Sequence, residues 1–294
     1  MNKEMPEDGP YFYQPQALTC TFEEGLKWFR ENYGQCVQRG HVPCNLPETL
    51  EEIKSQLLKK NAFTAPLEIN ADEFDQYKGQ AGYTRFYPGY YPGNLEEKSL
   101  EHFISFKILD FKGTDVFVDI ASEGSPLPEI VRRLTGAQAF AQDIMYPPGI
   151  QGHSIGGDAC DLPVPDNFFT KATVTCSLEH FEGNGDTKLF QELARVMKPE
   201  GQVCVVPLYL NSYAATLADP RYGYMFKVSY DSDSAIHLVE NWGNRHGRFY
   251  SVETLWKRIV VPTSASFRFS FYSIGGIILD RNVYARHVLL AVRT

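Results

Sequence analysis

Residues 119–126 read DIASEGSP and stand at the end of the apolar run TDVFVDI, 114–120. A strand that runs into a tight turn of small residues is a common binding place for nucleotide-type cofactors, because the turn lets a ligand approach the backbone closely. Such a turn is normally rich in glycine, whereas this one has only Gly124, with Glu123 in its middle. The stretch is therefore either a cofactor loop with unusual residues or an ordinary strand end, and the surrounding sequence must decide.

The segments around this stretch indicate an α/β fold. From residue 114 onward short apolar runs alternate with helical patterns, which predicts right-handed crossovers and a doubly wound, mostly parallel sheet. Two later apolar runs have no helix between them and predict an antiparallel pair that closes the sheet. The predicted strands are 114–121, 137–144, 171–177, 202–210, 266–276 and 284–294, with helices over 127–136 and 185–201.

The N-terminal third of the chain is predicted to be a helical extension. Acids near the start and glycine or lysine near the end favour helices over 21–40 and 46–61, and an amphipathic helix is predicted over 94–113. The segment 77–91 is crowded with tyrosine and broken by Gly and Pro. This composition predicts an irregular segment that packs against or covers something.

Composition excludes several classes of partner. The 294-residue chain has a formal charge of −8, so it offers no excess of cations to neutralise nucleic-acid phosphates. No apolar run is long enough to span a bilayer, and the N-terminus lacks the apolar stretch of a signal peptide. We therefore expect a cytoplasmic protein with reduced cysteines and with no nucleic-acid or membrane partner. A homodimer is left open.

Acidic residues lie at or near the ends of the predicted strands. Asp119 and Asp143 end the first two, Asp158 lies in the run GDACDLPVP, and Glu179 follows a later strand in the run CSLEHF. Ligands bind outside the carboxyl ends of the strands of an open parallel sheet. A phosphate-rich ligand would need cations and a glycine nest there. Acids suit a ligand with ribose hydroxyls, an adenine amino group and a cationic centre instead.

This arrangement resembles the class I S-adenosylmethionine-dependent methyltransferases over roughly residues 95–294. The resemblance implies a Rossmann-like, seven-stranded sheet, S-adenosylmethionine as the cofactor, and a methyltransferase domain over 95–294 that follows an extension and aromatic lid over 1–94. The segments that carry it follow the family's order: VFVDIASEGS, FAQDI, GDACDLPVPDNFF, ATVTCSLEHFEG, FQELARVMKPEGQVCVV and GRFYSVETLWKRI.

The resemblance also implies the cofactor contacts. Asp143 would hold the ribose hydroxyls, although a solvated strand-end acid is the alternative. Asp158 and the Ala159 backbone would face the adenine, unless Asp158 only makes a turn. Asp119 would bind the cofactor's amino group through water or fix the loop backbone. The full set implied is Asp119, Ala121, Gly124, Asp143, Asp158, Ala159, Cys176, Ser177 and Arg85.

The sequence departs from the family at its opening motif. Ala121, Glu123 and Ser125 stand where the family usually has glycines, which permit a positive φ and close backbone approach. Ala121 and Ser125 are small, and Gly124 could supply the left-handed residue one position later. Glu123 is the anomaly, since its carboxylate would either point away or contact the ammonium of the methionine moiety. The turn is expected to be retained in altered form.

His180 and Glu179, in the run SLEHF, are the candidate catalytic residues. The resemblance puts His180 beside the reactive methyl group, where an imidazole could act as general base for a hydroxyl. Glu179 is a candidate for the same role. The alternative for His180 is a histidine that anchors its loop onto the next helix.

Aromatic residues are the candidate substrate contacts. In the family the region that corresponds to 77–91 often forms a lid, so Tyr83, Tyr87 and Tyr91 are candidates to cover the acceptor. Arg85 is a candidate partner of the methionine carboxylate. Simple packing of the tyrosines is the alternative.

The run NWGNRHGRFY, 241–250, is a second candidate for the substrate rim. It contains Trp242 and His246 and follows the last parallel strand, where the family inserts substrate-binding elements. A solvated loop is the alternative.

A metal site is not expected. Cys36, His41 and Cys44 have the spacing C-x4-H-x2-C, whereas structural zinc sites usually show paired ligands two residues apart.

Two hypotheses of function follow. The first is a methyltransferase that transfers a methyl group from S-adenosylmethionine to a small molecule, by O-methylation of a sugar or another secondary metabolite. The second is a non-catalytic binding or scaffold protein on the same fold, in which Glu123 marks the loss of the cofactor. An NAD-type oxidoreductase would need a G-x-G-x-x-G turn at the strand–helix junction, and the sequence has none there.

Overall fold

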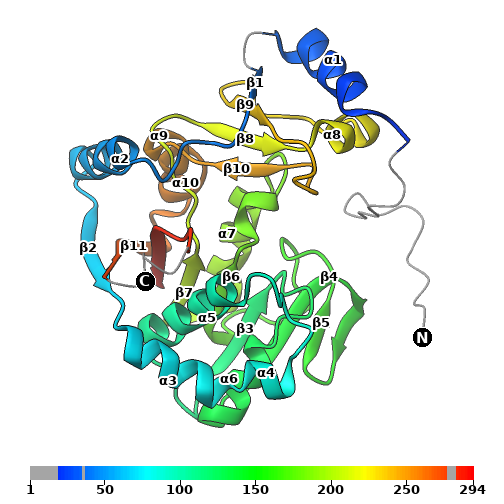
Figure 1. The fold of residues 1–294 in the computed structure, drawn as a ribbon. Helices are drawn as coiled ribbons and strands as arrows, with labels where there is room; N and C mark the ends of the chain where they lie inside the picture. Colours follow the sequence, from blue (N-terminus) through cyan, green and yellow to red (C-terminus); the bar gives the residue numbers. More distant parts are fainter. Residues whose placement is uncertain (1–18, 35–36, 277–282) are drawn as a thin grey trace.

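The computed structural model of the protein describes residues 19–34, 37–276 and 283–294, and these form two β-sheets (Figure 1). The larger sheet has eight strands, in the spatial order β2 (Phe63–Glu68), β11 (Phe267–Gly275), β12 (His287–Arg293), β7 (Met197–Val206), β6 (Phe169–Thr175), β3 (Val116–Ile120), β4 (Gln138–Gln151) and β5 (Ser154–Gly156). The smaller sheet has four, in the order β1 (Val37–Arg39), β9 (Ala235–Leu238), β8 (Ala215–Ala218) and β10 (Gly247–Phe249).

The predicted fold class is confirmed by the strand directions of the large sheet, which has eight strands rather than the predicted seven because β2 of the N-terminal segment pairs with β11. Strands β7, β6, β3 and β4 run parallel, and β12 is antiparallel to both of its neighbours, β7 and β11. Helices α6 and α7 make the crossovers between β3 and β4 and between β6 and β7. The helices of the main body are α2 (Pro47–Lys59), α3 (Ala71–Ala81), α5 (Leu95–Leu109), α6 (Leu127–Thr135), α7 (Gly185–Val196) and α9 (Val252–Leu255), followed by the π-helical turn η4 (Trp256–Val260) and α10 (Val261–Thr263).

Helices cover both faces of the large sheet, so its strands are buried on both sides. In β7, Val203 and Val205 join the core beneath α2, α7 and α9, while Cys204 and Val206 join the core beneath α3, α5 and α6. This alternation is the period of two expected for a strand with an apolar layer on each face. Within the described ranges, none of the helices combines the length and the apolar character needed to cross a bilayer.

Helix α5 differs from the amphipathic helix predicted over 94–113. It is buried almost all round, and even Glu97 and Glu101 are fully buried. The carboxylate of Glu97 accepts hydrogen bonds from the backbone N–H groups of Tyr284 (2.7 Å) and Ala285 (3.1 Å), which satisfies the buried charge. The helix is therefore a polar element inside the domain rather than a surface helix.

The tyrosine-rich segment is more regular than predicted. Its first part belongs to α3, whose buried face includes Phe74, Tyr77 and Ala81, and α4 (Tyr83–Phe86) follows after Gly82. Gly82 has a φ of 66°, which ends α3 with the left-handed residue that a helix C-terminus favours. Burial of the aromatic face outweighed the glycines that suggested a loop.

The four-stranded sheet was not predicted and lies above the large sheet in Figure 1, beside α1 (Phe22–Tyr33) and α8 (Pro220–Phe226). Its strand β1 comes from the N-terminal extension and pairs with β9, just as β2 pairs with β11 in the large sheet. Strands from both sides of residue 95 therefore pair in each sheet. The division into 1–94 and 95–294 stays a prediction.

Candidate functional site

The loop that follows β3, residues 121–125, keeps the backbone of a glycine-rich turn without the glycines. Ala121 has a φ of 51°, Glu123 of 40° and Gly124 of 76°. The left-handed region costs a residue with a Cβ atom about 1–2 kcal/mol, so Ala121 and Glu123 are strained. A strained backbone of this kind persists only where neighbouring groups hold it, and it is concentrated at functional sites.

Strand β4 supplies the groups that hold this strand-end loop. The Gln142 side-chain oxygen accepts the Ala121 N–H (3.1 Å), and the Asp143 carboxylate accepts the Glu123 N–H (2.8 Å). The Gly124 N–H donates to the Tyr146 hydroxyl (3.1 Å). Asp143 also accepts the N–H of Met145 (2.9 Å) and does not line the cavity described next, so its contacts are those of a loop support.

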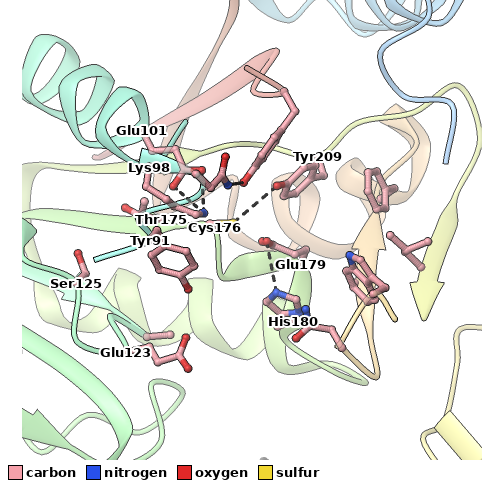
Figure 2. Close-up of a pocket in the computed structure, with 18 of the residues that line it drawn as sticks. Tyr91, Lys98, Glu101, Glu123, Ser125, Thr175, Cys176, Glu179, His180 and Tyr209 are labelled. Atoms are coloured by element: carbon pink, nitrogen blue, oxygen red, sulfur yellow. Dashed lines mark hydrogen bonds and ion pairs between the residues drawn. The ribbon is translucent and has the colours of Figure 1, made fainter. Parts of the chain in front are cut away.

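A cavity of about 630 Å³ lies against the strand-end loop (Figure 2). One side is formed by the loop, α5 and the end of β6, and the other by residues 41–45 and the four-stranded sheet. In Figure 2, Glu123, Ser125 and Tyr91 lie on one side, and Tyr209, Glu179 and His180 lie one below the other across from them. Of the residues proposed from the sequence, the cavity brings together Tyr91, Asp119, Ala121, Cys176, Glu179, His180 and Trp242.

His180 presents a free ring nitrogen next to a buried carboxylate. Its Nδ1 lies 2.6 Å from the His246 carbonyl oxygen, which can only accept, so Nδ1 carries the proton. In the neutral ring Nε2 therefore has a lone pair, and it lies 3.6 Å from Oε1 of Glu179. The Glu179 side chain is 6% exposed, and its Oε2 has no hydrogen-bond partner among the described residues. The pair is arranged to take up a proton and to stabilise the resulting imidazolium.

His246 forms hydrogen bonds with His180 and with the Glu179 backbone and does not contact the cavity. It is 2% exposed and does not line the cavity, unlike the prediction. Its Nδ1–H donates to the Glu179 carbonyl oxygen (3.1 Å), while its own carbonyl accepts from His180. Burial keeps the pKa of His246 well below its usual value, so the ring is neutral. The two histidines thus exchange hydrogen bonds. His180 is anchored to the segment before β10 rather than to the next helix, and its role as a base stays a prediction.

A buried ion pair on α5 was missed from the sequence. Lys98 Nζ lies 3.0 Å from Glu101 Oε1, and both side chains line the cavity although they are 7% and 0% exposed. Burial raises the pKa of Glu101, and the Lys98 ammonium opposes that rise. The available signal was the even spread of charges around the predicted helix, which leaves no purely polar face.

Asp119 is fully buried at the end of β3, on the cavity wall. Its Oδ1 accepts a hydrogen bond from the Thr173 hydroxyl (2.6 Å), and Oδ2 is without a partner among the described residues. Burial raises the pKa of Asp119 to about 7. Ser177, which was expected to contact the cofactor, instead donates to the Ile120 carbonyl (3.4 Å) and ties the ends of β3 and β6 together.

The predicted adenine contacts lie outside the cavity. The carboxylate of Asp158 accepts the N–H of Cys160 (2.9 Å) in an exposed turn, which is the alternative considered from the sequence. Ala159 is buried in the core beneath α7. Gly124 is also absent from the cavity wall, since it is an exposed residue of the strand-end loop.

The predicted lid residues are only partly at the cavity. Arg85 is exposed, with its guanidinium 4.9 Å from the Phe86 ring centre, and it does not reach the cavity. Tyr83 is buried and its hydroxyl pairs with His102 Nδ1 (2.8 Å). Tyr87 is packed in the same core, so Tyr91 alone of the three predicted tyrosines lines the cavity, joined by Tyr90.

Two of the three residues considered for zinc, His41 and Cys44, lie within the described residues. His41 and Cys44 both line the cavity, and Cys36 lies outside the described residues. Among the described residues no group of three His, Cys, Asp or Glu side chains could hold a metal ion.

Comparison with known proteins agrees with this fold. Residues 133–205 match a family described as "Methyltransferase domain". The chain is 35% identical over 95 residues to a demethylmenaquinone methyltransferase of Corynebacterium kroppenstedtii and 33% identical over 94 residues to one of Paenarthrobacter aurescens. Each match covers 30% of this chain and 40% or 36% of the relative, so the chain matches well under half of the relatives' length.

A solved structure of Burkholderia thailandensis 1,6-didemethyltoxoflavin-N1-methyltransferase has a TM-score of 0.46 at 13% identity, covering 78% of this chain and 92% of that chain. At that level the likeness supports no conclusion about this protein. The matched segment and the parallel sheet with an antiparallel β12 instead support the methyltransferase fold. Residues 133–205 and the strand order are those expected of a class I S-adenosylmethionine-dependent methyltransferase.

Proposed function

We propose that this protein transfers the methyl group of S-adenosylmethionine to a hydroxyl group of a small molecule. The observation that carries the proposal is one cavity lined both by the strand-end loop and by the His180–Glu179 pair. Two relatives are named as methyltransferases of demethylmenaquinone, which supports a small-molecule acceptor. A sugar or another secondary metabolite is the acceptor class predicted from the sequence.

The residues around the loop fit this cofactor. Asp119 offers an unpartnered buried oxygen, and the Lys98–Glu101 pair offers both signs of charge for the ammonium and carboxylate of a methionine moiety. When bound, S-adenosylmethionine supplies a methyl group already activated by its sulfonium. Lys98 and Glu101 thus replace Arg85 in the proposed contact with the methionine end.

His180 is proposed to accept the proton of the acceptor hydroxyl at Nε2. Its Nδ1–H is fixed by the His246 carbonyl, so the ring reaches the cavity in the tautomer that a base requires. Glu179, 3.6 Å from Nε2, stabilises the charged ring after proton uptake. The residues that line the cavity around His180 and Glu179 orient the acceptor hydroxyl and limit the access of water.

Binding of S-adenosylhomocysteine tests the proposal. Calorimetry with the full chain is expected to show one site, and mass spectrometry of the purified protein is expected to show bound S-adenosylmethionine or S-adenosylhomocysteine. A folded sample that binds neither would support the alternative of a scaffold protein on the same fold and would end the proposal.

A further inference from the structure

The far side of the cavity is mainly apolar, although His41, Asn45 and Asn244 also line it. Its apolar side chains belong to one hydrophobic cluster, and most of it lies on or beside the four-stranded sheet. The Tyr209 and Phe249 rings are 5.0 Å apart, and the Trp242 ring lies 6.2 Å from the His180 ring. We call this surface the apolar wall, and it consists of Val42, Cys44, Tyr209, Leu217, Trp242 and Phe249.

The charges of the cavity lie at its other end. Lys98, Glu101, Asp119 and Glu123 come from α5, the end of β3 and the strand-end loop. The cavity is therefore divided into a charged end, which suits the proposed cofactor, and an apolar end. His180 and Glu179 lie between the two ends, so an acceptor that presents a hydroxyl to His180 must place its remainder against the apolar wall (Figure 2).

Glu179 lies next to His180, where the reacting hydroxyl is placed. Its side chain is 6% exposed, and its Oε2 has no partner among the described residues. The cavity lining also includes His41, Asn45 and Asn244, but a further hydroxyl placed against Val42, Leu217, Trp242 or Phe249 would lose water without gaining a hydrogen bond. Flat rings also pack well against Trp242, Tyr209 and Phe249.

From this division we infer that the acceptor is a planar, largely apolar aromatic compound with one reacting hydroxyl, and not a sugar. The inference rests on the proposed function and narrows its acceptor class. In this arrangement the apolar wall contacts the ring system of the acceptor, and the His180–Glu179 pair contacts its hydroxyl group.

Calorimetry with two probes tests the inference, with the full chain saturated with S-adenosylhomocysteine. The probes are 2-naphthol, a planar phenol, and methyl α-glucoside, a polyhydroxylated compound of similar size. We expect 2-naphthol to bind at least about tenfold more tightly than the glucoside. Equal or tighter binding of the glucoside would overturn the inference. Failure of S-adenosylhomocysteine to bind would instead overturn the proposed function, so the two failures are distinguishable.

Trp242→Leu locates the binding on the apolar wall. Loss of the indole is expected to weaken 2-naphthol binding by about five- to tenfold and to leave the Kd of S-adenosylhomocysteine unchanged. The matched control is Trp28→Leu, because Trp28 is also half-buried but packs in α1 against Phe29 and Tyr33, and it should change neither Kd. Unchanged 2-naphthol binding by Trp242→Leu would overturn the inference.

Gly247→Ala is a second variant that does not remove any contact. A Cβ atom at Gly247 would lie 2.6 Å from a ring carbon of Trp242, so the indole must shift. Weaker binding of 2-naphthol with unchanged binding of S-adenosylhomocysteine is expected. The same Kd for 2-naphthol as in the wild type would contradict the position assigned to the acceptor.

Discussion

The two ends of the cavity are built in different ways. The charged end rests on a local motif, β3 followed by the strand-end loop, whose positive φ angles are held by three side chains of the neighbouring strand β4. The apolar end is assembled from segments far apart in the chain, residues 41–45, Tyr209 and the four-stranded sheet. A motif can tolerate unusual residues when its neighbours support the backbone, whereas an assembled wall depends on pairing between distant strands.

The largest effect is expected where the two ends meet. His180→Ala removes the proposed base and should lower kcat for methyl transfer to 2-naphthol by about 10²- to 10⁴-fold. The Kd of S-adenosylhomocysteine should remain unchanged, because the charged end is intact. Transfer of labelled methyl from S-adenosylmethionine measures the rate, with His153→Ala, an exposed histidine in the turn between β4 and β5, as the control. A His180→Ala variant as active as the control would remove His180 from the mechanism.

Asp119 should make the charged end sensitive to pH. Burial raises its pKa from 3.8 to about 7, so its contribution to stability is fully present below pH 4 and is lost as the pH rises towards 7. Compared with Asp119→Asn, the free energy of unfolding of the wild type should fall by at most about 4 kcal/mol over that range. Urea unfolding at a series of pH values measures the difference. Asp158→Asn removes an exposed carboxylate and should show the same dependence of unfolding free energy on pH as the wild type. If Asp119→Asn also showed the wild-type dependence, the predicted effect of the buried Asp119 carboxylate would be contradicted.

Asp143 tests how far β4 supports the loop. Asp143→Ala leaves the N–H groups of Glu123 and Met145 without their acceptor, so the free energy of unfolding should fall by about 1–3 kcal/mol. S-adenosylhomocysteine should bind more weakly, because the loop loses its conformation. Asp143→Asn keeps one acceptor oxygen and should lose less. If both variants bound S-adenosylhomocysteine as tightly as the wild type, the loop would not depend on this support.

The smallest effect is expected at Glu123. Glycine adopts a φ of 40° without strain, so Glu123→Gly should stabilise the protein by about 1 kcal/mol or less and change the Kd of S-adenosylhomocysteine less than about tenfold. Gly124→Ala, which introduces strain at a φ of 76°, should destabilise it. Calorimetry and urea unfolding measure both. A wild type that binds nothing, together with binding restored by Glu123→Gly, would favour the scaffold hypothesis.

The charged end could be predicted from the sequence to the extent that it is local. The alternation of strands and helices predicted the large sheet, and four of the residues proposed for the site from the sequence, Asp119, Ala121, Glu179 and His180, line the cavity. The side-chain contacts were less predictable, since Asp143 accepts the N–H of Glu123, which only the folded chain brings near. The contact of Asp158 with the N–H of Cys160 is local and is the turn that the sequence offered as an alternative.

Apart from Trp242, the apolar end was not predicted, and the reason is physical. Strands β1, β8, β9 and β10 are three or four residues long, which is too short for a clear periodic pattern. Their pairing, β1 with β9 in particular, joins segments from opposite halves of the chain. Lys98 and Glu101 were overlooked for a related reason, because charged residues on a helix predict a solvated face unless the tertiary structure buries them.

The crossed hydrogen bonds that link His180 and His246 have a consequence for protein engineering of this chain. The His180 ring donates to the His246 carbonyl, and the His246 ring donates to the Glu179 carbonyl. Because of these two hydrogen bonds, η3 (Leu178–His180) and the residues that lead into β10 would have to be replaced together. A chimaera that imports a foreign 241–250 segment to change the acceptor would also have to import the donor's 178–180 segment. The residues that contact the acceptor and the proposed base at position 180 would then be transferred together.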